Sequence, residues 1–241
     1  MAPLDRRARP RVVPLALLVA ASALACAHAT APRPVKLTRA IEPGPVRAVD
    51  VSINMASGTL QVNSGACALV HTDLEYDAER SDTRVRYSVR EARGELVIEE
   101  RRARHGGRDR PETRWDLCFG TETPLHVRVE LGAGNSALNV AALDLRSLEL
   151  EFGAGNAELD LRGDYRTDLH VDIDGGTGNV TVHVPRGAGV RVRADKGVGN
   201  ITAAGLRRVE DGYVNAAYGG AARTIELSID VGVGNINVVE G

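Results

Sequence analysis

Three groups of residues in this sequence have types and spacings that enzymes and binding sites use. The segment Gly132–Ala137 matches the GxGxxA pattern of turns that bind dinucleotides. The run Gly175–Asn179 has the glycine-rich composition of calcium-binding repeats, in which carboxylates supply hard oxygen ligands. A third group consists of acidic residues at alternate positions, and paired carboxylates are what glycoside cleavage requires. Its members are Glu149, Glu151, Asp172 and Asp174.

None of these groups is accompanied by what its chemistry needs. A dinucleotide site requires a helix directly after the turn, whereas residues 138–140 continue the alternation of a strand. The glycine-rich run carries asparagine where calcium repeats carry aspartate. The acidic series lacks an aromatic platform for sugars, since aromatics make up 3% of the chain, and the six histidines show no metal-ligand spacing. We therefore predict no catalytic residues, no metal and no cofactor, and we interpret the acidic series as the solvated face of strands.

The first part of the chain has the pattern of an export signal. Basic residues between Arg6 and Arg11 precede an apolar stretch over residues 12–25, which is shorter than the roughly 20 residues that span a bilayer. Small residues then lead into Cys26, in the order of a bacterial lipobox. We predict a signal peptide over residues 1–25 and acylation of Cys26. Ordinary cleavage at a nearby alanine is the alternative.

Three cysteines leave one odd thiol in an exported protein. If Cys26 carries lipid, Cys67 and Cys118 remain as a pair in an oxidising compartment, where a disulfide persists. We therefore predict a Cys67–Cys118 disulfide, with two unrelated buried thiols as the alternative. Residues 26–46 contain four prolines and no evident hydrophobic periodicity, which predicts an extended, lipid-anchored tether.

A tetrad, GxGN, recurs through the second half of the chain. Its five copies are Gly132–Asn135, Gly153–Asn156, Gly176–Asn179, Gly197–Asn200 and Gly232–Asn235. Successive asparagines lie 21, 23, 21 and 35 residues apart, so one insertion explains the last interval, and Ala56–Thr59 is a degenerate earlier copy. Glycine and asparagine tolerate positive φ, which predicts structural turns. The turn residues are Gly134, Asn135, Gly155, Asn156, Gly178, Asn179, Gly199, Asn200, Gly234 and Asn235.

Alternating apolar and polar residues flank each tetrad, as expected for strands with one buried and one solvated face. A period near 21 residues favours stacked strand–turn–strand units, a β-solenoid or β-roll, over a sandwich. In such a stack the turns align, and aligned asparagines can share amide hydrogen bonds. Residues 60–125 interrupt the repeat with longer, hairpin-like strands.

The GAGN, GTGN and GVGN turns, the early strand insertion and the ending YVNAAYGGAARTIELSIDVGVGNINV resemble one known family. It is the toast-rack, or adhesin-like, β-solenoid domain family of bacterial envelope proteins, which includes the C-terminal domain of LiaF-like envelope-stress regulators. The resemblance covers about residues 46–241. It implies an all-β fold in envelope proteins and brings no set of catalytic residues.

These observations predict a non-enzymatic cell-envelope lipoprotein. Its adhesin-like domain, residues 47–241, would contact an envelope protein or a surface polymer, on an outer-membrane anchor facing the periplasm or the surface. A formal net charge of −2 gives no electrostatic footprint for nucleic acid. A sensor of an envelope-stress system and a polysaccharide-active β-helix enzyme are the alternatives. We also expect the strand at residues 235–239 to be an open edge that supports self-association or partner docking.

Overall fold

The computed structural model describes residues 34–78, 81–102 and 113–241, which form an all-β structure. Their sixteen strands belong to one mixed sheet, and these residues contain no helix. A membrane-spanning helix is accordingly not found among them. Cys26, the predicted signal peptide and the first part of the predicted tether lie outside the described residues.

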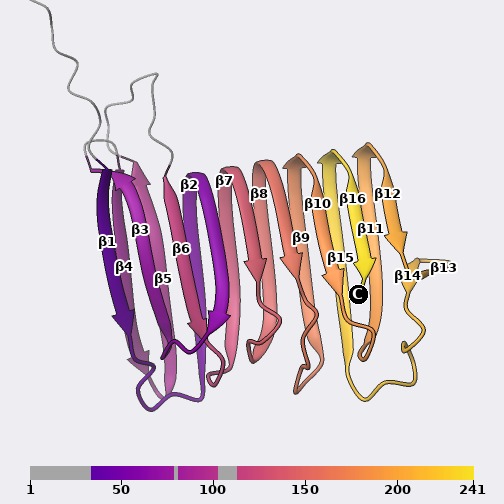
Figure 1. Cartoon of the computed structure of the whole chain (residues 1–241), viewed down its shortest axis with the longest axis horizontal. Helices are drawn as coiled ribbons and strands as arrows, with labels where there is room; N and C mark the ends of the chain where they lie inside the picture. Colours follow the sequence, from indigo (N-terminus) through magenta and orange to yellow (C-terminus); the bar gives the residue numbers. More distant parts are fainter. Residues whose placement is uncertain (1–33, 79–80, 103–112) are drawn as a thin grey trace, which may run out of the picture. The chain divides into compact units, whose positions relative to one another are not determined.

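The architecture repeats one unit, which we call a rung: two strand segments, or legs, joined by a GxGN turn or its degenerate copy. Neighbouring rungs pair in parallel, and their turns are in register, as in Gly134↔Gly155 and Asn135↔Asn156. The degenerate copy aligns in the same way, with Gly58 opposite Gly134. Figure 1 shows the rungs side by side as arches. In sequence order the rungs are β2 (Ala48–Gly65), β7 (Leu125–Asn139), β8 (Leu145–Asp160), β9 (Leu169–Thr177) with β10 (Val180–Val184), β11 (Gly189–Val198) with β12 (Ile201–Ala204), and β15 (Thr224–Val233) with β16 (Ile236–Glu240).

Alternation along each leg separates the core from the solvent. In β7, Val127, Val129 and Leu131 are buried, while Arg128 and Glu130 between them are exposed. The buried residues of both legs form one hydrophobic cluster that runs through all the rungs. Side chains alternate between the buried and the exposed face along each strand. Because the rungs stack in register, this alternation gives continuous apolar rows inside and polar rows outside.

At the turns, neighbouring backbones approach too closely for any side chain. Gly155 has a φ of 134°, and a Cβ added to it would lie 1.6 Å from the carbonyl oxygen of Gly134. The next residue in the turn links the rungs, because Asn156 donates its backbone N–H and its Nδ2 to Oδ1 of Asn135, at 3.2 and 3.1 Å. The same pair of bonds continues along what we call the asparagine ladder, through Asn179, Asn235 and Asn200.

The order of the rungs differs from the order of the chain. The rung β15–β16 lies between β9–β10 and β11–β12, because β15 pairs with β9 and β11, and β16 pairs with β10 and β12. The expectation of an open edge at residues 235–239 is therefore wrong. The last rung of the row is β11–β12, and β12 pairs only with β16.

The side chains that face the core explain this order. Val129, Leu150, Ile173 and Ile229 form one inner row, which ends at the smaller Ala194 on β11. In the next inner row the position opposite Val231 is Lys196, which is exposed. A lysine that faces the core would lose its solvation between two rungs, whereas at the last rung its ammonium group reaches water. An inward-facing charge also discourages further strand addition.

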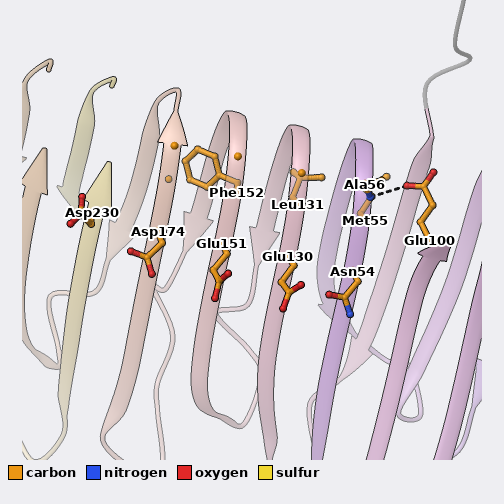
Figure 2. A pocket seen from close by; sticks show the side chains of 14 residues that line it. Asn54, Met55, Ala56, Glu100, Glu130, Leu131, Glu151, Phe152, Asp174 and Asp230 are labelled. Carbon is orange, nitrogen blue, oxygen red and sulfur yellow. Dashed lines mark hydrogen bonds between the residues drawn. The ribbon is translucent and has the colours of Figure 1, made fainter. Parts of the chain in front are cut away.

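Both ends of the row carry additional strands. At the first rung, β5 (Arg93–Arg102) and β6 (Arg114–Gly120) extend the two legs of β2, followed by β4 (Ser81–Arg90) and β3 (Val70–Asp77). Oε2 of Glu100 accepts the N–H of Ala56 there, at 2.9 Å (Figure 2). At the other end, the hairpin of β13 (Arg207–Val209) and β14 (Gly212–Val214) pairs with the base of β11.

The predicted tether is shorter than expected. Pro34–Ile41 forms strand β1, which pairs antiparallel with β3. Proline is acceptable at the first position of an edge strand, because no N–H is needed there. Val35, Leu37 and Ile41 recur at alternate spacing after it, with Leu37 and Ile41 partly packed against the core. This segment is therefore part of the sheet, and the domain begins before residue 47.

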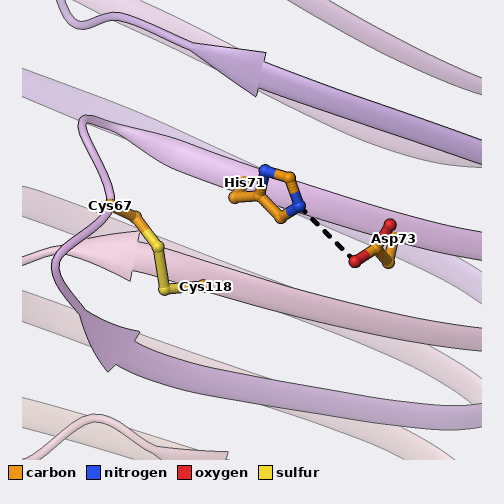
Figure 3. The surroundings of a disulfide bond; sticks show 4 residues. All are labelled: Cys67, His71, Asp73 and Cys118. Carbon is orange, nitrogen blue, oxygen red and sulfur yellow. Dashed lines mark ion pairs between the residues drawn. A yellow bond between two sulfur atoms is a disulfide. The ribbon is translucent and has the colours of Figure 1, made fainter.

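A disulfide joins Cys67 to Cys118, with their Cα atoms 6.2 Å apart. Cys118 lies in β6, and Cys67 lies in the turn that leads from β2 to β3 (Figure 3). The bond therefore ties the turn after the first rung to a strand that extends that rung, where the parallel repeat gives way to antiparallel strands.

We predict that Gly155→Ala destabilises the protein strongly. A side chain at this φ costs roughly 1–3 kcal/mol, and the overlap with the Gly134 carbonyl adds to that cost. Gly187→Ala is the matched control, because a Cβ there meets nothing within 4 Å, and it should change stability by less than about 0.5 kcal/mol. Chemical denaturation measures both variants. Equal stability of the two would contradict the close approach at the turns.

We predict that the double variant Cys67→Ser/Cys118→Ser unfolds more easily than the natural chain. The disulfide closes a loop with a sequence separation of 51 residues. In the chain-entropy model such a loop contributes about 4 kcal/mol. Urea unfolding of both proteins under oxidising conditions measures the difference, and an unchanged midpoint would show that the bond does not constrain the unfolded chain.

Candidate functional site

Parallel register places one acidic residue of each of five rungs in a line on the outer face of the first legs. Asn54 on β2 precedes this line. We call the line the acidic row: Glu130, Glu151, Asp174, Asp230 and Asp195. Neighbouring strands lie about 4.8 Å apart, so the carboxylates repeat at that interval. All five residues are exposed.

A groove of about 890 Å³ runs along the acidic row, directly below the GxGN turns. Four members of the row line it, Glu100 lines its end at the first rungs, and the glycine backbone of the turns forms its upper border. Figure 2 shows the carboxylates in line across neighbouring strands. The first glycine of three tetrads, Gly132, Gly153 and Gly176, lines the groove two residues after a carboxylate of the row.

Part of the acidic row is paired with a cation and part is not. The guanidinium of Arg128 binds Glu130 at 3.1 Å, Glu149 at 2.7 Å and Glu151 at 2.5 Å. The hydrogen bond with Glu130, followed by the charges of Glu149 and Glu151, raises the pKa of Arg128. Asp174, Asp230 and Asp195 form no ion pair with any described residue. The groove therefore carries uncompensated negative charge at Asp174 and Asp230, and the acidic row continues beyond the groove to Asp195.

The sequence GGTGN has a packing reason. Gly175 occupies an inner position, and a Cβ there would lie 2.3 Å from Cζ of Phe152 on the neighbouring rung. The Phe152 ring is buried, so the large side chain of one rung uses the space that glycine leaves in the next. The extra glycine thus belongs to the core below the groove, and it supplies no ligand.

The acidic residues singled out from the sequence do come together. Glu149 lies opposite Asp172, and Glu151 lies opposite Asp174. The Glu149 and Glu151 side chains are each 47% exposed and both are bound to Arg128, so neither lies in the apolar pocket that holds the general acid of a glycosidase. Within the described residues no cluster of three His, Cys, Asp or Glu is placed to hold a metal ion. What the arrangement offers is a line of negative charge for binding.

A second row, which sequence reasoning missed, places Asp50, His126 and Ser147 opposite one another on β2, β7 and β8. Nδ1 of His126 lies 3.0 Å from Oγ of Ser147. Asp50 is held instead by Arg93, whose Nη2 donates to it at 2.6 Å, and this hydrogen bond lowers the pKa of Asp50. The interval of 21 residues between His126 and Ser147 was a signal in the sequence, whereas nothing placed Asp50 beside them.

This row lacks what a serine hydrolase needs. A triad requires a carboxylate that orients the histidine, and Asp50 is turned to Arg93. It also requires free N–H donors for an oxyanion, whereas the strands around Ser147 are paired on both sides. We interpret the three residues as polar contacts on the solvated face.

Comparisons with known proteins agree with the fold. A model of the "N-terminal domain of toast_rack, DUF2154" matches residues 31–183, and one for "Cell wall-active antibiotics response LiaF, C-terminal" matches residues 133–238. No curated protein matches the chain. The crystal structure of a "putative cell adhesion protein" from Clostridium sporogenes is 27% identical, with a TM-score of 0.83, over 87% of this chain and 100% of that one.

A "putative adhesin" from Bacteroides fragilis is 13% identical with a TM-score of 0.31, over 86% of this chain and 97% of that one. Another from Parabacteroides distasonis is 10% identical with a TM-score of 0.28, over 87% and 97%. We draw no conclusion from these two TM-scores. The first family model spans more than half of this chain. The protein therefore belongs to the toast-rack family.

Proposed function

We propose that this protein is a non-enzymatic contact module of the bacterial cell envelope, exported by a signal peptide and anchored through a lipid on Cys26. The stacked rungs form a β-solenoid that presents an adhesin-like surface to an envelope protein or a surface polymer. The anchor would place it at the outer membrane, facing the periplasm or the surface. Binding without turnover is the activity that we assign to it.

The observation that carries the proposal is the similarity to the "putative cell adhesion protein" of Clostridium sporogenes along its full length, at 27% identity and a TM-score of 0.83. The surface chemistry also supports a binding function. The described residues hold a groove with a line of carboxylates and no arrangement suited to catalysis. Side chains that repeat at the strand spacing suit an elongated partner, since each rung offers an equivalent contact.

A second candidate function is that of an accessory or sensor in an envelope-stress system. It is favoured by the match of residues 133–238 to the LiaF C-terminal model, whose description refers to a response to cell-wall-active antibiotics. A reporter of cell-wall stress distinguishes the two proposals. Deleting the gene should change the reporter's response to such antibiotics if the protein is regulatory, and should leave that response intact if the protein only makes contacts.

We predict that reversing charge in the groove weakens binding to isolated envelopes. Asp174→Lys/Asp230→Lys removes two carboxylates that have no ion-pair partner among the described residues and are exposed. Exposed ion pairs contribute about 0.2–1 kcal/mol each, so the two changes together should weaken binding by roughly 2- to 30-fold. Sedimentation of the labelled protein with cell envelopes measures the change.

The matched control is Glu158→Lys, because Glu158 is an exposed acidic residue on the second leg of β8, away from the groove. It should leave binding unchanged within twofold. Each change to lysine alters the net charge by two units, so a general effect of net charge would give the single control about half the loss of binding free energy seen in the double variant. Binding that survives charge reversal in the groove would exclude the groove as the contact. Release of soluble sugars from envelope glycans by the protein would overturn the non-enzymatic assignment.

A further inference from the structure

The rung β15–β16 occupies a slot whose two walls match each other. Ile173 of β9 and Ala194 of β11 are both in register with Ile229, and Asn179 and Asn200 are both bonded to Asn235. Both walls are therefore in one register relative to the rung between them. A β15–β16 rung from a second copy of the chain would find the same partners in this slot.

This slot is formed by parts of the chain that precede its occupant. The connection from β10 to β11, residues 185–188, passes from one wall to the other. The connections from β7 to β8 and from β8 to β9, residues 140–144 and 161–168, join rungs that are direct neighbours. Both walls are therefore synthesised before Thr224, and the occupant is a later segment that must enter between them.

The occupant is joined to the far wall by a long segment. Residues 205–223 connect β12 to β15 and include the hairpin β13–β14. Asn215 fastens this segment, because its Nδ2 donates to the carbonyl oxygens of Pro185 and Ala188, at 3.3 and 2.8 Å, and its Oδ1 accepts the N–H of Val190 at 2.9 Å. A connection of this length lets the rung reach beyond its own slot when these bonds are not yet made.

The outer side of β11 is a poor alternative place for the rung. Stacking on the outer side of β11 would enclose Lys196 between apolar residues, and β14 already pairs with that edge at Arg191 and Val192. The rung itself carries the apolar residues Ile229, Val231, Ile236 and Val238, all of which are buried. Left undocked, these side chains would be exposed, so a rung that misses its own slot needs another.

We propose that the slot between β9–β10 and β11–β12 also accepts the rung β15–β16 of a second copy of this chain, which gives a dimer by reciprocal exchange. The exchanged rung makes the same backbone pairs and the same asparagine bonds as in the monomer. Exchange of an identical element is a low-cost route to a dimer for this reason. The balance between monomer and dimer is set by the protein concentration while the rungs dock.

The experiment uses two full-length variants that carry one added cysteine each in a Cys26→Ser background. Asp172→Cys lies on β9, and Ser228→Cys lies opposite it on β15. The chains differ in length through a tag, are unfolded together in urea without reductant, are refolded at several concentrations and are then oxidised briefly. Directly opposed residues of neighbouring strands are within disulfide distance. A disulfide between the two chains forms only when β15 of one lies beside β9 of the other.

The matched control pairs Glu149→Cys with Asp172→Cys, which are opposed on β8 and β9 but joined by a short connection. We expect the fraction of chains in cross-linked heterodimers to increase about tenfold in the test mixture for each tenfold rise in concentration, while the dimer is the minor species. The control mixture should stay at background. Heterodimers no more abundant than in the control, at every concentration and with native circular dichroism, would overturn the proposal.

If a cysteine variant fails to refold, the Cys26→Ser chain without added cysteines provides the test. Refolded over the same concentrations and separated by size, it should give a dimer that persists on dilution and converts to monomer only after unfolding. A monomer at all concentrations would exclude exchange. These readouts need no binding partner, so they are independent of the proposed contact function.

Discussion

The close approach of backbones at the GxGN turns is the constraint on which the remainder of the structure depends. Each turn places a glycine against the carbonyl oxygen of the equivalent glycine on the neighbouring rung. Any side chain there would push the rungs apart. The asparagine that follows then spans the gap with two hydrogen bonds to its counterpart. With the turns fixed in this way, both legs of every rung inherit one register. The inner apolar rows and the outer acidic row are consequences of that register.

The same constraint explains why the turns do not decide the order of the rungs. All the turns offer equivalent contacts, so a rung fits between any two others as far as the turn is concerned. Order is decided by what each rung presents to the core. Ala194 and Lys196 suit the last rung, whereas Ile229 and Val231 fill the space between two rungs. The turn contacts in the slot are the same whichever copy of the chain supplies the rung. Exchange between copies is therefore physically reasonable.

Much of this could be predicted from the residues. The tetrads located the turns, alternation located the strands and their buried faces, and the odd cysteine count pointed to the pair Cys67 and Cys118, which the structure joins. The position of β15–β16 could not be predicted, because repeat spacing carries no information about spatial order. Strand β1 was not predicted, because the prolines in this segment indicated an extended tether. The apolar residues Val35, Leu37 and Ile41 at alternate spacing were the signal for a strand. The acidic row followed only in part, since the pairing of Asp174 with Asp230 depends on that same unpredicted order.

The asparagine ladder runs 135–156–179–235–200 and holds the rungs in that order. Native-state hydrogen exchange of the turn amides tests it most directly, because these N–H groups lie at exposed turns and are protected only by the ladder. We expect the amides of Asn156, Asn179, Asn235 and Asn200 to exchange far more slowly than that of Gly219, which no neighbouring rung covers. Protection of Asn156 and Asn179 together with rapid exchange at Asn235 and Asn200 would contradict the claim.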